Sequence, residues 1–164
     1  MKNTKQLAGL GLLLALALIF SYIEYLIPLP IGIPGVKLGL ANSLILLLLY
    51  RYDLKTAAGI SFLRIVLTGF LFGNLAMILY SLAGALCSMA VMWGVKKTDC
   101  FSLIGVSILG GVAHNFGQLF VAVLTLKTIM LSLYFPVLMI SGCITGAIIG
   151  MIAHELQGRL GRNE

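Results

Sequence analysis

The chain has 164 residues, of which 60% are hydrophobic and 10% are charged, and its mean hydropathy is +1.10. A soluble domain usually carries about 25% charged residues, so lipid rather than water is expected to surround most of the exterior. The net charge of +6 is dispersed along the chain, whereas nucleic-acid binding usually requires a basic stripe on one face.

Six apolar segments predict an all-α polytopic membrane protein, because a helix of about 20 apolar residues crosses the hydrocarbon core. The expected transmembrane helices cover about Leu7–Ile27, Pro34–Tyr50, Thr56–Phe72, Leu75–Val95, Phe101–Leu126 and Ile129–Leu156. Pro136 is expected to kink the sixth helix. Little remains for a soluble module, so residues 1–164 are expected to form a single transmembrane domain.

The first apolar segment resembles a signal peptide only in part. No small-residue cleavage site follows it, and we expect it to remain as the first helix. Lys and Arg residues concentrate on one side of the bundle, which the positive-inside rule assigns to the cytoplasm together with both termini. That side holds Lys2, Lys5, Arg51, Lys55, Lys96, Lys97, Arg159 and Arg162, whereas the opposite side holds Lys37 and Lys127.

Small residues recur at four-residue spacing in three of the expected helices, and such spacing lets helix backbones approach closely in lipid. These residues are Gly142, Gly146 and Gly150 in the sixth helix, Gly11 and Ala15 in the first, and Gly69 and Gly73 in the third. Packing within the bundle is the expected role, and a docking face for a partner subunit is the alternative.

Ionisable residues are costly inside a membrane span and are candidate functional residues by default. Arg64 lies about eight residues into the third helix, which places it about 12 Å deep, near the midplane. Either it pairs internally with Glu24, or it is a fixed cation that binds an anionic group of a ligand. Glu24 itself is expected to pair with Arg64 or Lys37, or to bind an amine of a ligand.

The segment between the first two helices, PLPIGIPGVKLGLAN, covers residues 28–42 and is rich in proline and glycine. A helix that begins after such a loop presents unpaired N–H groups and a positive dipole end, which attract anions. Lys37 is expected in its first turn and Asn42 one to two turns deeper. The alternative is an ordinary loop with an interfacial lysine.

Three polar side chains lie close together in the fifth helix, within GGVAHNFGQLF. His114 and Gln118 are four residues apart and share a face of the helix, and Asn115 adjoins them. They are expected either to contact a ligand or to form hydrogen bonds between helices. One histidine makes no metal site, and Cys87, Cys100 and Cys143 have no metal-ligand spacing, so neither metal nor cofactor is expected.

The depths of these polar residues along the helices are similar. Tracing each helix from its assigned side puts the whole set at mid-membrane or further outward, and we therefore predict a substrate pocket open to the outside. The candidate substrate-binding residues are Glu24, Lys37, Asn42, Arg64, His114, Asn115 and Gln118.

Three of these features together resemble a known family. The segment from Pro34 to Asn42, Arg64, and the segment from Gly110 to Gln118 are similar to the Gx transporter family, also labelled heptaprenyl diphosphate synthase component I. That family is similar to the S components of energy-coupling factor (ECF) transporters. The resemblance implies a six-helix protein of a bacterial cell membrane that captures a small molecule from outside.

The same resemblance implies partners. S components work with a membrane coupling subunit and two ATPases, and their first helix carries an Ala-xxx-Ala docking motif. Gly11 and Ala15 stand at the corresponding positions, with a departure at the first. No GxxxxGK[ST] motif occurs in the chain, so energy for transport is expected from a partner or an ion gradient.

The synthase label is harder to reconcile with the residues. Prenyl diphosphate synthases hold Mg²⁺ with aspartate-rich DDxxD segments, because Mg²⁺ prefers carboxylate and phosphate oxygens. Here Asp53 and Asp99 stand isolated in loops, and His114 and His154 are expected at opposite depths. An independent enzyme is therefore not expected. The alternatives to a transport subunit are an accessory subunit in prenyl diphosphate or quinone metabolism, which would hold a lipid-like substrate, and a structural subunit of a redox complex.

Overall fold

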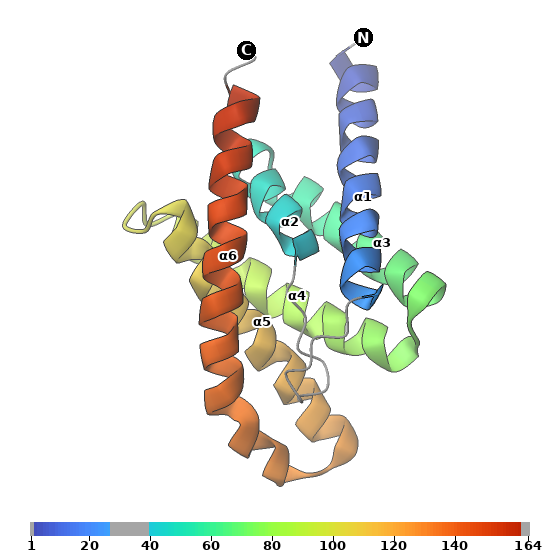
Figure 1. Cartoon of the computed structure of the whole chain (residues 1–164), viewed down its shortest axis with the longest axis vertical. Coiled ribbons are helices and arrows are strands. Elements are labelled where there is room, and N and C mark those ends of the chain that lie inside the picture. The colour runs from blue at the N-terminus through green and yellow to red at the C-terminus, as the bar shows by residue number, and fades with distance from the viewer. Residues whose placement is uncertain (1, 27–39, 162–164) are drawn as a thin grey trace.

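The computed structural model describes residues 2–26 and 40–161, and these residues form helices and short turns without a strand. The helices are α1 (Lys2–Leu26), α2 (Leu40–Arg51), α3 (Leu54–Phe72), α4 (Leu75–Lys96), α5 (Leu103–Leu126) and α6 (Phe135–Gly161), and a 3₁₀ helix, η1 (Ile129–Tyr134), precedes α6. The all-α class and the six helices are confirmed (Figure 1). The expected start of the second helix at Pro34 lies outside the described residues.

Five helical segments of the described chain are long and apolar enough to cross a membrane. They are Gln6–Leu26, Leu54–Phe72, Leu75–Lys96, Leu103–Leu126 and Ile129–Gly158. The chain is therefore a multi-pass membrane protein. The described part of α2 has 12 residues, a length of about 18 Å, which is shorter than a full crossing, and the sixth crossing remains a prediction. The start of α1 and the end of α6 lie at the same end of the molecule (Figure 1), and the cytoplasmic location of that end remains a prediction.

Helix α2 lies at the centre of the protein. Its leucine-rich stretch from Leu44 to Leu49 is 0–3% exposed, and the helix packs against α1, α3 and α6. The longer helices show the opposite pattern, with large apolar side chains such as Phe70 and Leu86 more than 70% exposed. Those exposed side chains suit contact with lipid, whereas the stretch Leu44–Leu49 of α2 is apolar on every face, as suits a helix surrounded by protein.

Side-chain caps fix where three of the helices begin. Asn74 accepts a hydrogen bond from the backbone N–H of Met77 at 2.9 Å, and Ser102 caps α5 in the same way. Asp53 accepts from both the backbone N–H and the hydroxyl of Thr56. The hydroxyl bond is the main reason that the pKa of Asp53 is lower than usual. These caps satisfy N–H groups that the first turn of a helix leaves without partners.

The helix interruption expected at Pro136 lies directly before the proline, where η1 ends at Tyr134 and α6 begins at Phe135. Pro136 thus lies in the first turn of α6, where its missing N–H costs no helical hydrogen bond and its fixed φ favours helix initiation.

Glycines hold α5 and α6 in backbone contact, as the spacing in the sixth helix predicts. A Cβ on Gly142, Gly146 or Gly150 would lie 2.7–3.0 Å from α5, with the Cα atoms of Ile104 and Ile108 among the atoms struck. From the other side, a Cβ on Gly111 would lie 2.5 Å from the carbonyl oxygen of Gly142. Packing within the bundle is therefore confirmed for this ladder.

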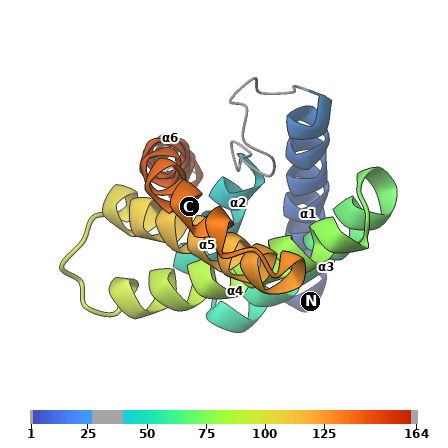
Figure 2. The same cartoon turned by 90° about the horizontal axis from the view of Figure 1, so that it is seen from below.

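Helix α5 approaches α4 just as closely. A Cβ on Gly117 would lie 2.7 Å from the carbonyl oxygen of Ala83. Seen from below, α5 lies between α4 and α6 (Figure 2).

The small residues of α1 behave differently: Gly11 and Ala15 are exposed, and a Cβ on Gly11 would meet no described atom within 4 Å. For these two residues, packing within the described bundle was the wrong expectation.

Candidate functional site

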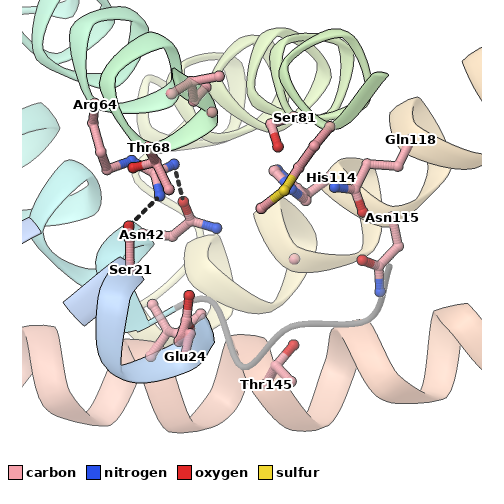
Figure 3. A pocket seen from close by; sticks show the side chains of 15 residues that line it. Ser21, Glu24, Asn42, Arg64, Thr68, Ser81, His114, Asn115, Gln118 and Thr145 are labelled. Carbon is pink, nitrogen blue, oxygen red and sulfur yellow. Dashed lines mark hydrogen bonds between the residues drawn. The ribbon is translucent and has the colours of Figure 1, made fainter. Parts of the chain in front are cut away.

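A pocket of about 70 Å³, partly open to the surroundings, lies where the six described α-helices meet. Polar side chains from every one of these helices line it (Figure 3). The lining residues are Ser21, Glu24, Asn42, Arg64, Ile65, Thr68, Gly69, Met77, Ser81, Gly111, His114, Asn115, Gln118, Thr145 and Ile149.

Arg64 is the buried cation of this pocket, and its side chain is 9% exposed. One terminal nitrogen, Nη2, donates a hydrogen bond to Asn42 Oδ1 at 3.1 Å, and the other, Nη1, donates to Ser21 Oγ at 3.4 Å. The second bond is long for N–H···O geometry. Both acceptors are neutral. The Nε atom is buried and has no hydrogen-bond partner in the described part of the chain.

Thr68 lies one turn after Arg64 on α3 and faces the same pocket. Its hydroxyl oxygen is also buried and has no partner among the described residues. Buried polar groups in proteins are nearly always hydrogen-bonded, yet the described residues supply no partner for Arg64 Nε or for the Thr68 hydroxyl, which lie four residues apart on α3.

Glu24 lines the pocket from α1, one turn beyond Ser21, and its carboxylate interacts electrostatically with the Arg64 guanidinium. Arg64 thus interacts with the charge of Glu24 and also lines the pocket, and its binding of a ligand anion remains a prediction. The guanidinium donates hydrogen bonds to Ser21 and Asn42.

The α5 residues line the other side of the pocket (Figure 3). Asn115 Nδ2 donates a hydrogen bond to the backbone carbonyl of Leu138 in α6 at 2.8 Å, so this amide also joins two helices. His114 and Gln118 lie against Gly84 of α4. Asn115 therefore forms the expected interhelix hydrogen bond, and its contact with a ligand remains a prediction.

The structure brings together six of the seven candidate residues, namely Glu24, Asn42, Arg64, His114, Asn115 and Gln118. Lys37 lies outside the described residues. Sequence reasoning missed the hydroxyl side chains Ser21, Thr68, Ser81 and Thr145, although two of them had a usable signal. Ser21 precedes Glu24 by three residues and Thr68 follows Arg64 by four, which are the spacings at which helical residues share a face.

The cysteines lie apart from this chemistry, since Cys87, Cys100 and Cys143 are free thiols and do not line the pocket. Within the described residues, His, Cys, Asp and Glu side chains form no group of three that could hold a metal ion. The pocket as described offers hydrogen bonds and charge. Its chemistry therefore suits recognition of a ligand.

Comparison with known proteins gives one match. A model of the family described as heptaprenyl diphosphate synthase component I matches residues 13–156. No curated protein and no solved structure matches the chain. Since the family match covers most of the sequence and all of the pocket-lining residues, the chain belongs to the heptaprenyl diphosphate synthase component I family.

Proposed function

We propose that this protein is a membrane subunit that binds a small anionic or amphipathic molecule in the pocket and moves it across the membrane with partner subunits, as the S components of ECF transporters do. The observation that carries the proposal is Arg64. It lies buried in a membrane span, where a charged side chain is expensive, and it faces a pocket while Nε has no described partner.

An anionic ligand would satisfy this arrangement. A carboxylate or phosphate can accept from Arg64 Nε and from the Thr68 hydroxyl together, and charge-assisted hydrogen bonds of this kind are about twice as strong as neutral ones. Leaving a buried donor without a partner costs about 1–3 kcal/mol. Binding of an anion that reaches these groups would remove that cost.

Partner subunits enter the proposal for two reasons. The chain contains no Walker motif, so ATP-driven transport requires another subunit. The α1 face that carries Gly11 and Ala15 is exposed and leaves room for a neighbouring helix, as close packing through small residues in lipid requires. This is the face on which a coupling subunit would dock.

The test is native mass spectrometry of gently extracted protein, which reports bound small molecules and partner subunits together. Wild-type protein is expected to carry a bound anion. The Arg64→Gln variant should lose at least about tenfold in ligand occupancy, because hydrogen bonds to charged groups are worth about 1.5–3 kcal/mol. Arg51→Gln is the matched control, since Arg51 lies at the exposed end of α2 outside the pocket. A folded Arg64→Gln protein with wild-type occupancy would refute the proposal.

A second function has its own support, namely an accessory role in prenyl diphosphate metabolism. The family description names a synthase component, and an apolar groove adjoins the pocket. Gly69 lines both, and the groove continues along Phe70, Gly73, Asn74, Leu75, Ala76 and Ile78. A prenyl chain would fit a groove open to lipid. This alternative predicts co-purification with a soluble prenyl synthase and no small-molecule uptake.

A further inference from the structure

The pocket has two chemically different ends (Figure 3). The first, which we call the arginine end, contains Ser21, Glu24, Asn42, Arg64 and Thr68 from α1, α2 and α3. The second, which we call the amide end, contains Ser81, His114, Asn115 and Gln118 from α4 and α5. The arginine end favours an anion, whereas the amide end offers neutral groups that can donate and accept hydrogen bonds.

Gly84 of α4 lies directly behind the amide end. A Cβ on this buried glycine would lie 2.9 Å from Gln118 Cγ and 2.9 Å from both Cε1 and Nε2 of His114. Because nonbonded carbon atoms are at rest about 3.5–4.0 Å apart, a methyl group here would displace both side chains. The absence of a side chain at 84 therefore allows His114 and Gln118 to lie back against α4.

Helix α5 cannot relieve such a clash by moving away. It is in backbone contact with α4 at Gly117 and with α6 at Gly111, on either side of His114 along the helix. The struck atoms belong to side chains, and both side chains line the pocket. Empty space on the pocket side is where they would go, so a methyl group at 84 would shorten the pocket from its amide end.

We infer that Gly84 is a specificity-determining residue that sets the space at the amide end, and that the ligand is a small anion with a hydrogen-bonding group, such as an amide, at its other end. The inference rests on the proposed function, because it takes the arginine end as the anion site. It adds the second recognition group and the residue that limits its size.

The test uses two kinds of probe on purified protein in lipid nanodiscs. Inorganic phosphate reaches only the arginine end, whereas monoamides of dicarboxylic acids, from succinamate to glutaramate and adipamate, place a carboxylate at one end and an amide at the other. Gly84→Ala should weaken binding of the best-bound monoamide by about tenfold or more, since one methylene in a pocket changes affinity by about that factor. Phosphate binding should stay unchanged.

Gly94→Ala is the matched control, because Gly94 lies on the same helix and a Cβ there would meet no described atom within 4 Å. It should leave both probes unaffected. If the two alanine variants bind the monoamides equally, or if Gly84→Ala weakens phosphate and monoamide alike, the inference is overturned. If wild-type protein binds phosphate without dependence on Arg64, the proposed function fails first and this inference with it.

If Gly84→Ala fails to fold, a second variant, His114→Ala, tests the same inference. His114→Ala enlarges the amide end from the opposite side and should shift the best-bound monoamide to one at least one methylene longer. An unchanged length preference in a folded His114→Ala protein would overturn the inference.

Discussion

Replacing Gly146 with alanine tests the close packing of α5 against α6, on which the geometry of the pocket depends. The new Cβ would lie 2.7 Å from Ile108 Cα and 2.8 Å from the carbonyl oxygen of Ser107. Since carbon atoms settle at about 3.5–4.0 Å, the two backbones must separate by about 1 Å. Neither struck atom belongs to a flexible side chain, so the strain falls on the helices themselves.

The expected magnitude follows from two opposing effects. Overpacking costs about 1–3 kcal/mol, and the backbone clash places Gly146→Ala at the upper end, about 3 kcal/mol. The greater helix propensity of alanine offsets about 1 kcal/mol. The free energy of unfolding should therefore fall by about 2 kcal/mol relative to wild type.

The assay is reversible unfolding in mixed micelles with increasing dodecyl sulfate, followed by circular dichroism. Gly158→Ala is the control, because it lies on the same helix and its Cβ would meet no described atom within 4 Å. That variant should be stabilised by up to about 1 kcal/mol. If Gly146→Ala were as stable as Gly158→Ala, the close approach of α5 and α6 would be disproved.

Two further predictions concern the cap of α3 and the face of α1. The Thr56 hydroxyl lowers the pKa of Asp53. The hydrogen bond between the two residues therefore stabilises the folded protein above the ordinary pKa of about 4, and this stabilisation is lost as the pH falls through the lowered pKa. The melting-temperature gap between wild type and Thr56→Val should shrink in acid, and a constant gap would contradict this. Gly11→Leu should abolish pull-down of a coupling subunit. Gly9→Leu should preserve it, because a Cβ at Gly9 also meets no described atom within 4 Å but lies on another side of α1. Equal effects of the two substitutions would count against docking at Gly11.

Much of the site was predictable because membrane proteins make ionisable residues conspicuous. Arg64 and Glu24 stand out among apolar neighbours, and their depth follows from the rise of a helix. The hydroxyls of Ser21 and Thr68 escaped notice because serine and threonine are common in membrane helices, where they bond their own backbone. Their role depends on which residues face them, and only the tertiary structure shows that.

Gly84 illustrates a role that the sequence cannot reveal, because it depends on which residues of other helices lie next to it. In the chain it looks like Gly94, ten residues later on the same helix. One faces His114 and Gln118 across a tight contact, whereas the other faces open space. For Pro136, the sequence predicted an interrupted helix, but only the structure shows that the preceding segment is a 3₁₀ helix and that the proline lies in the first turn of α6.

The short central helix α2 has a consequence for how the protein is made. The 12 described residues of α2 gain little from lipid alone, and α2 is enclosed partly by α6, which follows it much later in the chain. The packing site of α2 is therefore complete only after α6 has been synthesised. Until α6 is present, the leucines of α2 lack part of their packing partners. Chains truncated before α6 should therefore expose these leucines and be recognised by membrane quality control.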